Sequence, residues 1–301
     1  MSESNVVYMK QELKQETLFS SKESYWKNAW KRLYENKPAL LGLILLLILI
    51  TTAILAPYLS SQTYYDTHLP LKNLKPSKTF WFGTDELGRD LFIRIGWGAR
   101  ISLFVGMMAA LIDMCIGVFY GTIAGIAHQK VGEIMMRILD ILYSLPYLLI
   151  VILLMVILKP GIFTIILALT FTGWINMARI VRGQILQIKQ SDYVLAAQMM
   201  GCSSWRLMRY HLIPNAIGSI ITTMTLTIPT AIFTEAFLSF LGLGVQAPIA
   251  SWGTMASDGL SALRYYPWRL FFPAAFISIT MLSFNLLGDG LRDAFDPRLR
   301  S

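Results

Sequence analysis

Residues 39–56 read ALLGLILLLILITTAILA and contain no charged side chain. A helix needs about 20 mostly apolar residues to cross the ~30 Å hydrocarbon core of a bilayer, so this stretch predicts a membrane-spanning helix. It is longer than the core of a secretory signal and lacks a small-residue cleavage site, which predicts a retained anchor. Further apolar stretches lie at 101–127, 141–158, 162–178, 216–243 and 270–287. We therefore expect an all-α integral membrane protein with six transmembrane helices.

The composition agrees with a membrane protein. Hydrophobic residues make up 55% of the 301 residues and charged residues 15%, whereas about a quarter of the residues in a soluble domain are charged. The net charge is +8, but the basic residues cluster beside apolar blocks, which indicates orientation in a bilayer rather than nucleic-acid binding. The two cysteines, Cys115 and Cys202, predict neither a disulfide framework nor a metal site. We expect no metal and no cofactor.

The basic residues also predict an orientation. With the N-terminus in the cytoplasm, about two thirds of the 26 Lys and Arg residues lie on the cytoplasmic side, as the positive-inside rule requires. Both termini are then cytoplasmic. Just before the first span, Trp26, Trp30 and Leu33 have the spacing of one helical face, which predicts an amphipathic helix on the inner leaflet.

Three glycines at four-residue spacing, Gly117, Gly121 and Gly125, form a smooth strip on the second span. Such a strip lets another helix approach closely. The approaching helix can belong to the same chain or to a second copy, and we favour packing within one bundle.

The loop at 183–215 carries most of the functional information. Two short helices are expected around Gly201, whose lack of a side chain permits a turn that other residues resist. Ala196 and Ala197 leave room for another surface, and Pro214 suits the first turn of the next span. An ordinary amphipathic connector would have a similar composition.

The spacing of Ala196, Ala197, Gly201 and Pro214 resembles the cytoplasmic "EAA" loop of ABC-transporter permeases, the membrane subunits of binding-protein-dependent importers. Leu195 replaces the glutamate of that motif, and His211 replaces a hydrophobic residue. In the family, this loop forms coupling helices that insert into a groove of an ATPase subunit. The resemblance implies that role for Asp192, Leu195, Ala196, Ala197, Gly201, Arg206 and Pro214.

Three more stretches resemble the peptide and nickel subfamily of these permeases: 82–90 with Arg94 and 98–103, 235–244 with Pro248 and 251–253, and 285–293 with 296–297. The chain is most similar to the C-type membrane subunits of oligopeptide permeases. The likeness implies a type I importer fold in the inner membrane of a bacterium. The implied partners are a second homologous permease, two ATPase subunits and an external binding protein that delivers a peptide. A dipeptide or nickel permease is the alternative.

The resemblance also divides the chain. We expect a cytoplasmic segment at 1–38, the first span and an external loop at 39–100, a five-helix core at 101–290, and a cytoplasmic tail at 291–301. In the external loop, Gly83, Asp85, Gly88, Arg89 and Asp90 either contribute to docking or gating, or form a compact turn that orients the second span.

Two carboxylates, Asp113 and Glu235, fall inside predicted spans. A charge at the bilayer centre costs about 2.5–3.5 kcal/mol on insertion scales, so each is expected to face protein or water. They either line a translocation path or pair with hydroxyl and amide groups of neighbouring helices.

Two rival classes are less consistent with the sequence. A membrane enzyme would need a nucleophile–base pair or an H-E-x-x-H helix, and His68, His128 and His211 lie in different loops outside such a motif. A secondary transporter usually shows internal repeats, and none stands out. The chain also has no phosphate-binding loop of the G-x-x-x-x-G-K-[ST] type, so we expect a non-enzyme whose ATP is hydrolysed by partner subunits.

Overall fold

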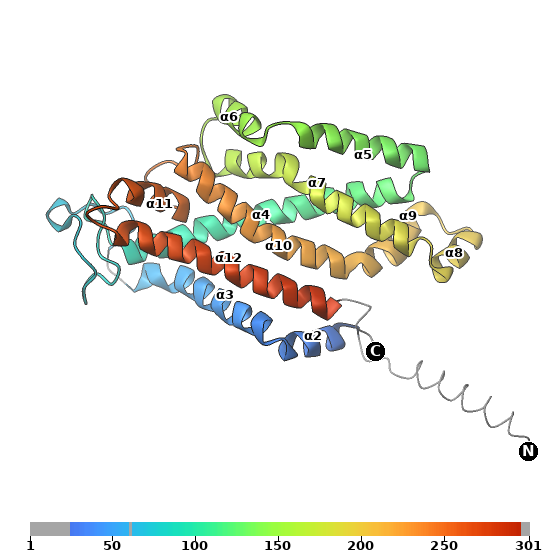
Figure 1. Ribbon diagram of the computed structural model, residues 1–301, viewed down its shortest axis with the longest axis horizontal. Helices are drawn as coiled ribbons and strands as arrows, with labels where there is room; N and C mark the ends of the chain where they lie inside the picture. The colour runs from blue at the N-terminus through green and yellow to red at the C-terminus, as the bar shows by residue number, and fades with distance from the viewer. Residues whose placement is uncertain (1–24, 60–61, 296–301) are drawn as a thin grey trace, which may run out of the picture.

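The computed structural model describes residues 25–59 and 62–295. Within these residues the regular structure is helical, apart from an isolated bridge between Thr84 and Asp90. Five long helices lie along one axis (Figure 1): α3 (Lys37–Leu55), α4 (Leu91–Ile126), α7 (Ile162–Ile188), α10 (Ile213–Phe240) and α12 (Trp268–Phe295). All five are long and apolar enough to cross a membrane. The expected all-α membrane fold is confirmed.

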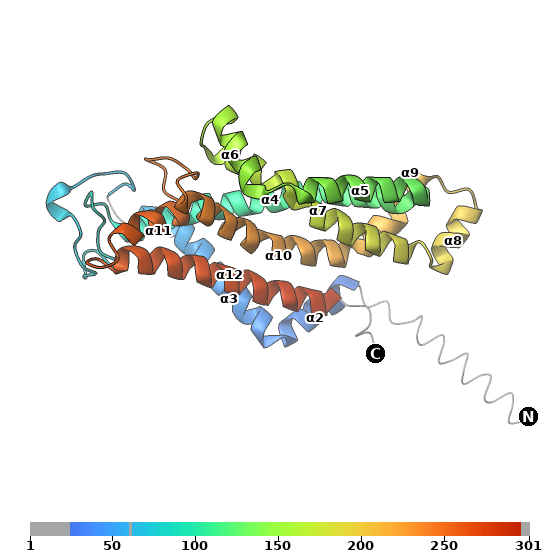
Figure 2. The ribbon, with the colours of Figure 1, turned by 45° about the horizontal axis from the view of Figure 1, so that its top comes forward.

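The expected third span differs from a single helix. α5 (Gln129–Ser144) and α6 (Tyr147–Leu158) meet at an angle of 77°, so residues 141–158 are not one straight helix. Pro146 has no N–H for a helical hydrogen bond, and it favours extended backbone at Leu145, which has φ −72° and ψ 133°. Figure 2 shows α6 turning away from the line of α5. There are up to six candidate spans if this bent pair counts as one.

When α5 and α6 are counted together as one traverse, successive traverses alternate in direction and define two ends of the bundle (Figure 1). The α11 end carries residues 62–90 and α11 (Trp252–Ser261), and the α8 end carries α8 (Asp192–Met199) and α9 (Ser204–Leu207). Because the number of traverses is even when α5 and α6 are counted together, α2 (Tyr25–Glu35) and the end of α12 both lie toward the α8 end.

The N-terminal helix α2 packs on α12 and on the start of α3. Ala29 and Leu33 are buried against Ala39 and Ala294, whereas Trp30 is 55% exposed. Trp30 lies outside this contact, and the location of α2 on the inner leaflet stays a prediction. The side chain of Trp26 lies outside the described part of the chain.

The glycine strip of α4 faces another helix of the same chain. α4 packs most extensively on α7. A Cβ added at Gly117 would lie 2.6 Å from the Met177 Cβ, and one at Gly125 would lie 2.7 Å from the Ile185 Cγ2. Gly121 faces the carbonyl oxygen of Ala178. The glycine strip therefore allows close packing of α4 on α7 within one bundle.

Replacing Gly121 with leucine is expected to lower the thermal stability of the detergent-solubilised chain. Forcing extra carbon atoms into a packed contact costs about 1–3 kcal/mol, and the Ala178 backbone oxygen cannot rotate away. The control is Gly183→Leu on α7, where no atom lies within 4 Å of an added Cβ. Equal unfolding midpoints for the two variants would contradict this account of the α4–α7 contact.

Candidate functional site

The first candidate site is the helix α8. Val194 and Ala197 are buried, and they pack into a cluster that includes Val181 of α7 and Leu212 just before α10. α8 therefore shares one buried cluster with residues of α7 and of the segment that leads into α10. The expectation that both alanines face a partner is corrected for Ala197, because this side chain is covered by its own chain, while Ala196 is exposed.

The opposite face of α8 and the segment after it are apolar and uncovered. Met199 is 91% exposed and Met200 is 82% exposed. Asp192 lies in the first turn of α8, and Asp192 and Arg206 are both exposed. The large exposed apolar side chains of this region are Tyr193, Leu195, Met199, Met200, Trp205 and Tyr210. We call these six residues the α8 surface.

Gly201 ends α8 as the sequence predicts. Its φ is +82°, in the left-handed region that favours glycine. The N–H of Gly201 donates to the Gln198 carbonyl (2.9 Å), and the N–H of Cys202 donates to the Ala197 carbonyl (3.1 Å). These bonds satisfy carbonyl groups that the helix end would otherwise leave unpaired.

Pro214 lies at the start of α10, as the sequence predicts. It lies in the first turn of α10, but α9 and the π-helical stretch η3 (Met208–Leu212) lead into α10 without a gap. The N–H of Ile213 donates to the Met208 carbonyl, a wider turn than in an α-helix. Such a turn accommodates the missing N–H of a proline. Residues Ser204–Phe240 therefore act as one long element.

The second candidate site is the turn before α4, at the α11 end. Gly83 and Gly88 have φ values of +77° and +73°. The Asp85 carboxylate is 4% exposed. Its Oδ1 accepts hydrogen bonds from the N–H groups of Leu87 (2.9 Å) and Arg89 (3.0 Å), and its Oδ2 accepts one from Arg89 Nε (2.6 Å). The geometry is that of the compact turn, the second of the two expectations for these residues.

Asp90 fixes the start of α4. Its Oδ1 accepts a hydrogen bond from the N–H of Phe92 (2.8 Å), which caps the helix. Burial raises the pKa of the Asp90 carboxyl, and hydrogen bonds from the N–H groups of Phe92 and Ile93 act in the opposite direction. Thr84, which the sequence does not single out, accepts from the N–H of Leu74 (2.8 Å) and ties the turn to the preceding loop.

Glu235 joins three elements. The Ser102 hydroxyl of α4 donates to Glu235 Oε2 (3.0 Å), and the Ser239 hydroxyl donates to Oε1 (2.8 Å). The same Ser102 oxygen accepts from the N–H of Trp252 (3.3 Å), at the start of α11. Glu235 is fully buried. It therefore pairs with hydroxyl groups and does not line an open path in this structure.

Asp113 is also buried, at 3% exposure, but its surroundings differ. Its Oδ1 has no hydrogen-bond partner among the described residues, and neither has the nearby Tyr147 hydroxyl. Gly173 of α7 makes room for the carboxylate, because an added Cβ would overlap it. The contribution of Asp113 to a translocation path stays a prediction from the sequence.

Comparisons with known proteins agree with this architecture. Residues 117–301 match the family described as "Binding-protein-dependent transport system inner membrane component". The chain belongs to this family. Residues 24–76 match a second family, described as "N-terminal TM domain of oligopeptide transport permease C".

Individual relatives resemble this permease over nearly its whole length. The oligopeptide transport system permease protein OppC of Bacillus subtilis is 62% identical over 92% of this chain and 91% of its own. The dipeptide transport system permease protein DppC of the same organism is 60% identical over 92% of this chain and 87% of its own. The OppC protein of Escherichia coli K12 is 42% identical over 92% of each. The family predicted from the sequence motifs is confirmed.

Proposed function

We propose that this permease is a membrane subunit of an ATP-driven importer, and that the importer moves oligopeptides delivered by an external binding protein. The observation that carries the proposal is the 62% identity, along nearly the whole chain, to a relative named as an oligopeptide permease. The 60% identity to a dipeptide permease favours dipeptides as the second candidate cargo. Both cargoes share a peptide backbone with free ends.

In the proposed orientation, the α8 end lies in the cytoplasm and the α11 end outside. The distribution of basic residues supports this choice. The α8 surface then meets the ATPase subunit, because exposed side chains such as Met199 and Met200 form an apolar patch of the kind that marks an interaction site. Val194 and Ala197 share a buried cluster with residues of α7 and α10, and through this cluster movement of the ATPase is passed to the membrane helices.

The working importer is proposed to contain a second, homologous permease and two ATPase subunits. One bundle with five or six candidate spans encloses little room for an extended peptide. A partner bundle would complete the wall of the path and would supply a second surface like that of α8.

Purification of the tagged chain from its native membrane tests the proposal. We expect two ATPase subunits and one non-identical permease to co-purify, as measured by native mass spectrometry. Deletion of the chain is expected to abolish uptake of a labelled tetrapeptide, and restoring the gene should restore uptake. Recovery of a transport-competent chain without ATPase subunits would contradict the proposal. Uptake of dipeptides alone would select the second candidate cargo.

A further inference from the structure

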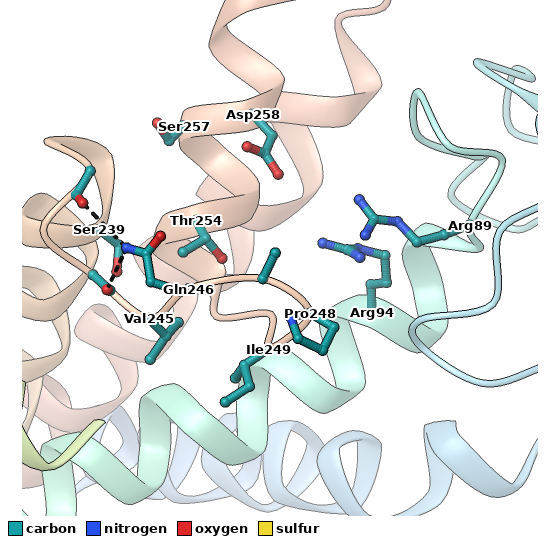
Figure 3. A pocket seen from close by; sticks show the side chains of 13 residues that line it. Arg89, Arg94, Ser239, Val245, Gln246, Pro248, Ile249, Thr254, Ser257 and Asp258 are labelled. Atoms are coloured by element: carbon teal, nitrogen blue, oxygen red, sulfur yellow. Dashed lines mark hydrogen bonds between the residues drawn. The ribbon is translucent and has the colours of Figure 1, made fainter. Parts of the chain in front are cut away.

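A cavity of about 270 Å³ lies at the α11 end, apart from the α8 surface. Its walls come from the turn before α4, the first turn of α4, the segment after α10, and α11 (Figure 3). Ligand pockets usually span about 300–1,000 Å³. This cavity is therefore sized for one end of a ligand rather than for a whole one.

One wall of the cavity carries two guanidinium groups. Arg89 and Arg94 lie side by side (Figure 3), and they are 8% and 4% exposed. Both contact the carboxylate of Asp85: Arg89 Nε lies 2.6 Å from Oδ2, and Arg94 Nε lies 3.5 Å from the same oxygen. Two buried positive charges thus share one carboxylate, and a second anion would complete the pairing.

Arg94 has unused hydrogen-bonding capacity. Its Nη1 donates to the Tyr64 carbonyl (3.3 Å), whereas its buried Nε, 3.5 Å from Asp85 Oδ2, forms no hydrogen bond among the described residues. Leaving a buried, charged donor without a hydrogen-bond acceptor is unfavourable. Carboxylates are the anions that guanidinium groups pair with most readily in two-point fashion.

The rest of the cavity suits the residue that bears such a carboxylate. Gln246 and Thr254 supply amide and hydroxyl groups, while Val245, Pro248 and Ile249 supply apolar surface. Asp258 lies on the wall that faces the arginines (Figure 3), and it forms no ion pair with them in the described structure. The cavity thus has Asp258 on one wall and the two guanidinium groups on another, and the opposite charges attract one another across it.

We propose that this cavity binds the C-terminal carboxylate and last residue of a peptide on the external side of the permease. The carboxylate lies against Arg89 and Arg94, and the last side chain lies against Val245 and Ile249. The proposal rests on the proposed function and orientation, which place the α11 end outside. An acidic side chain of the binding protein has the same carboxylate chemistry, and the experiment separates it from a peptide terminus.

The test uses arginine modification by phenylglyoxal on the complete importer in nanodiscs, without binding protein. Labelling of each arginine is measured by mass spectrometry, in the presence of trialanine, trialanine amide or sodium acetate at equal concentrations. We expect trialanine to reduce labelling of Arg89 and Arg94 at least threefold, and the amide and acetate to have no effect. Arg264, an exposed arginine at the same end of the bundle, is the internal control and should be labelled equally throughout.

Other outcomes overturn the proposal in distinct ways. Equal protection by acetate would indicate an adventitious anion only. In a separate arm, peptide-free binding protein is added in place of the small ligands, and protection in that arm, without protection by trialanine, would assign the cavity to an acidic side chain of that partner. Absence of labelling at both arginines without ligand would show that the cavity is closed. None of these results depends on transport, so they leave the uptake and co-purification experiments to decide the proposed function separately.

A substitution on the facing wall gives a second measurement. Asp258→Asn removes a negative charge that opposes an incoming carboxylate, so the trialanine concentration for half-protection should fall about twofold or more. Asp258 is exposed, so this variant is expected to fold even if variants of the buried arginines do not. An unchanged or higher concentration would contradict the placement of the ligand between Asp258 and the arginines.

Discussion

Replacing Asp85 with lysine is expected to prevent the chain from accumulating as a folded permease. The Asp85 carboxylate accepts three hydrogen bonds within the turn and pairs with both Arg89 and Arg94. Removing one partner of a buried ion pair costs about 3–5 kcal/mol. The lysine would also add a third positive charge beside two buried ones. Size-exclusion chromatography of a fluorescent fusion should show little or no monodisperse protein.

The control for this prediction is Lys72→Glu, a charge reversal at an exposed position of the same loop. It should give the elution profile and yield of the unmodified chain. A folded, monodisperse Asp85→Lys variant would instead favour the other expectation for this turn, a contribution to docking or gating. If the variant assembles normally but its ATPase no longer responds to the binding protein, then Asp85 contributes to docking rather than to the scaffold.

Replacing Gly201 with valine is expected to reduce peptide uptake at least about tenfold while the chain still inserts and assembles. At φ +82° a side chain strains the backbone by about 1–2 kcal/mol, and more for a β-branched residue. No atom lies within 4 Å of the added Cβ, so the effect comes from the backbone alone. Relief of this strain rotates α8 relative to α9, and the α8 surface no longer fits its partner. Uptake and ATP hydrolysis are measured together in proteoliposomes.

Two further variants define what a loss of uptake means. Gly183→Val changes a glycine of α7 that has free space around it and ordinary helical backbone, and it should transport normally. Ala196→Trp adds bulk on the exposed face of α8 and should weaken ATPase association directly. Ala197→Trp is not a clean test, because Ala197 is buried in its own chain. Normal uptake by Gly201→Val, with normal ATP use, would show that α8 is not the transmission element.

Much of the fold follows from local properties of the chain. Uninterrupted apolar stretches such as 39–56 predict spans, since a bilayer accepts only backbone whose polar groups are bonded internally. Gly201 and its turn were also predictable, because only glycine adopts positive φ without strain. The family could be recognised from motif spacing alone, and both family comparisons confirm it.

The bend at Pro146 and the continuous helix through Pro214 show where local reasoning fails. Both prolines remove a helical hydrogen bond. At Leu145–Pro146 the chain turns by 77°, whereas before Pro214 a π-helical stretch carries the helix onward. From the sequence alone, a break in the helix is expected at each of the two prolines. Near Pro214, where the helix continues, Leu212 and Ala216 are buried in one cluster with residues of α7 and α8.

Which side chains meet across the bundle was decided only by the tertiary structure. The sequence shows that Asp85, Glu235 and Ala197 are present and that carboxylates inside a membrane need partners. It does not show that Ser102 lies beside Glu235, that Val194 and Ala197 share a buried cluster with Val181 of α7, or that Arg94 borders a cavity with Asp258 on the other wall. These contacts join residues far apart in the chain, and their geometry depends on how whole helices pack. Local propensity and spacing therefore determined the membrane helices and the family, and long-range packing determined the sites.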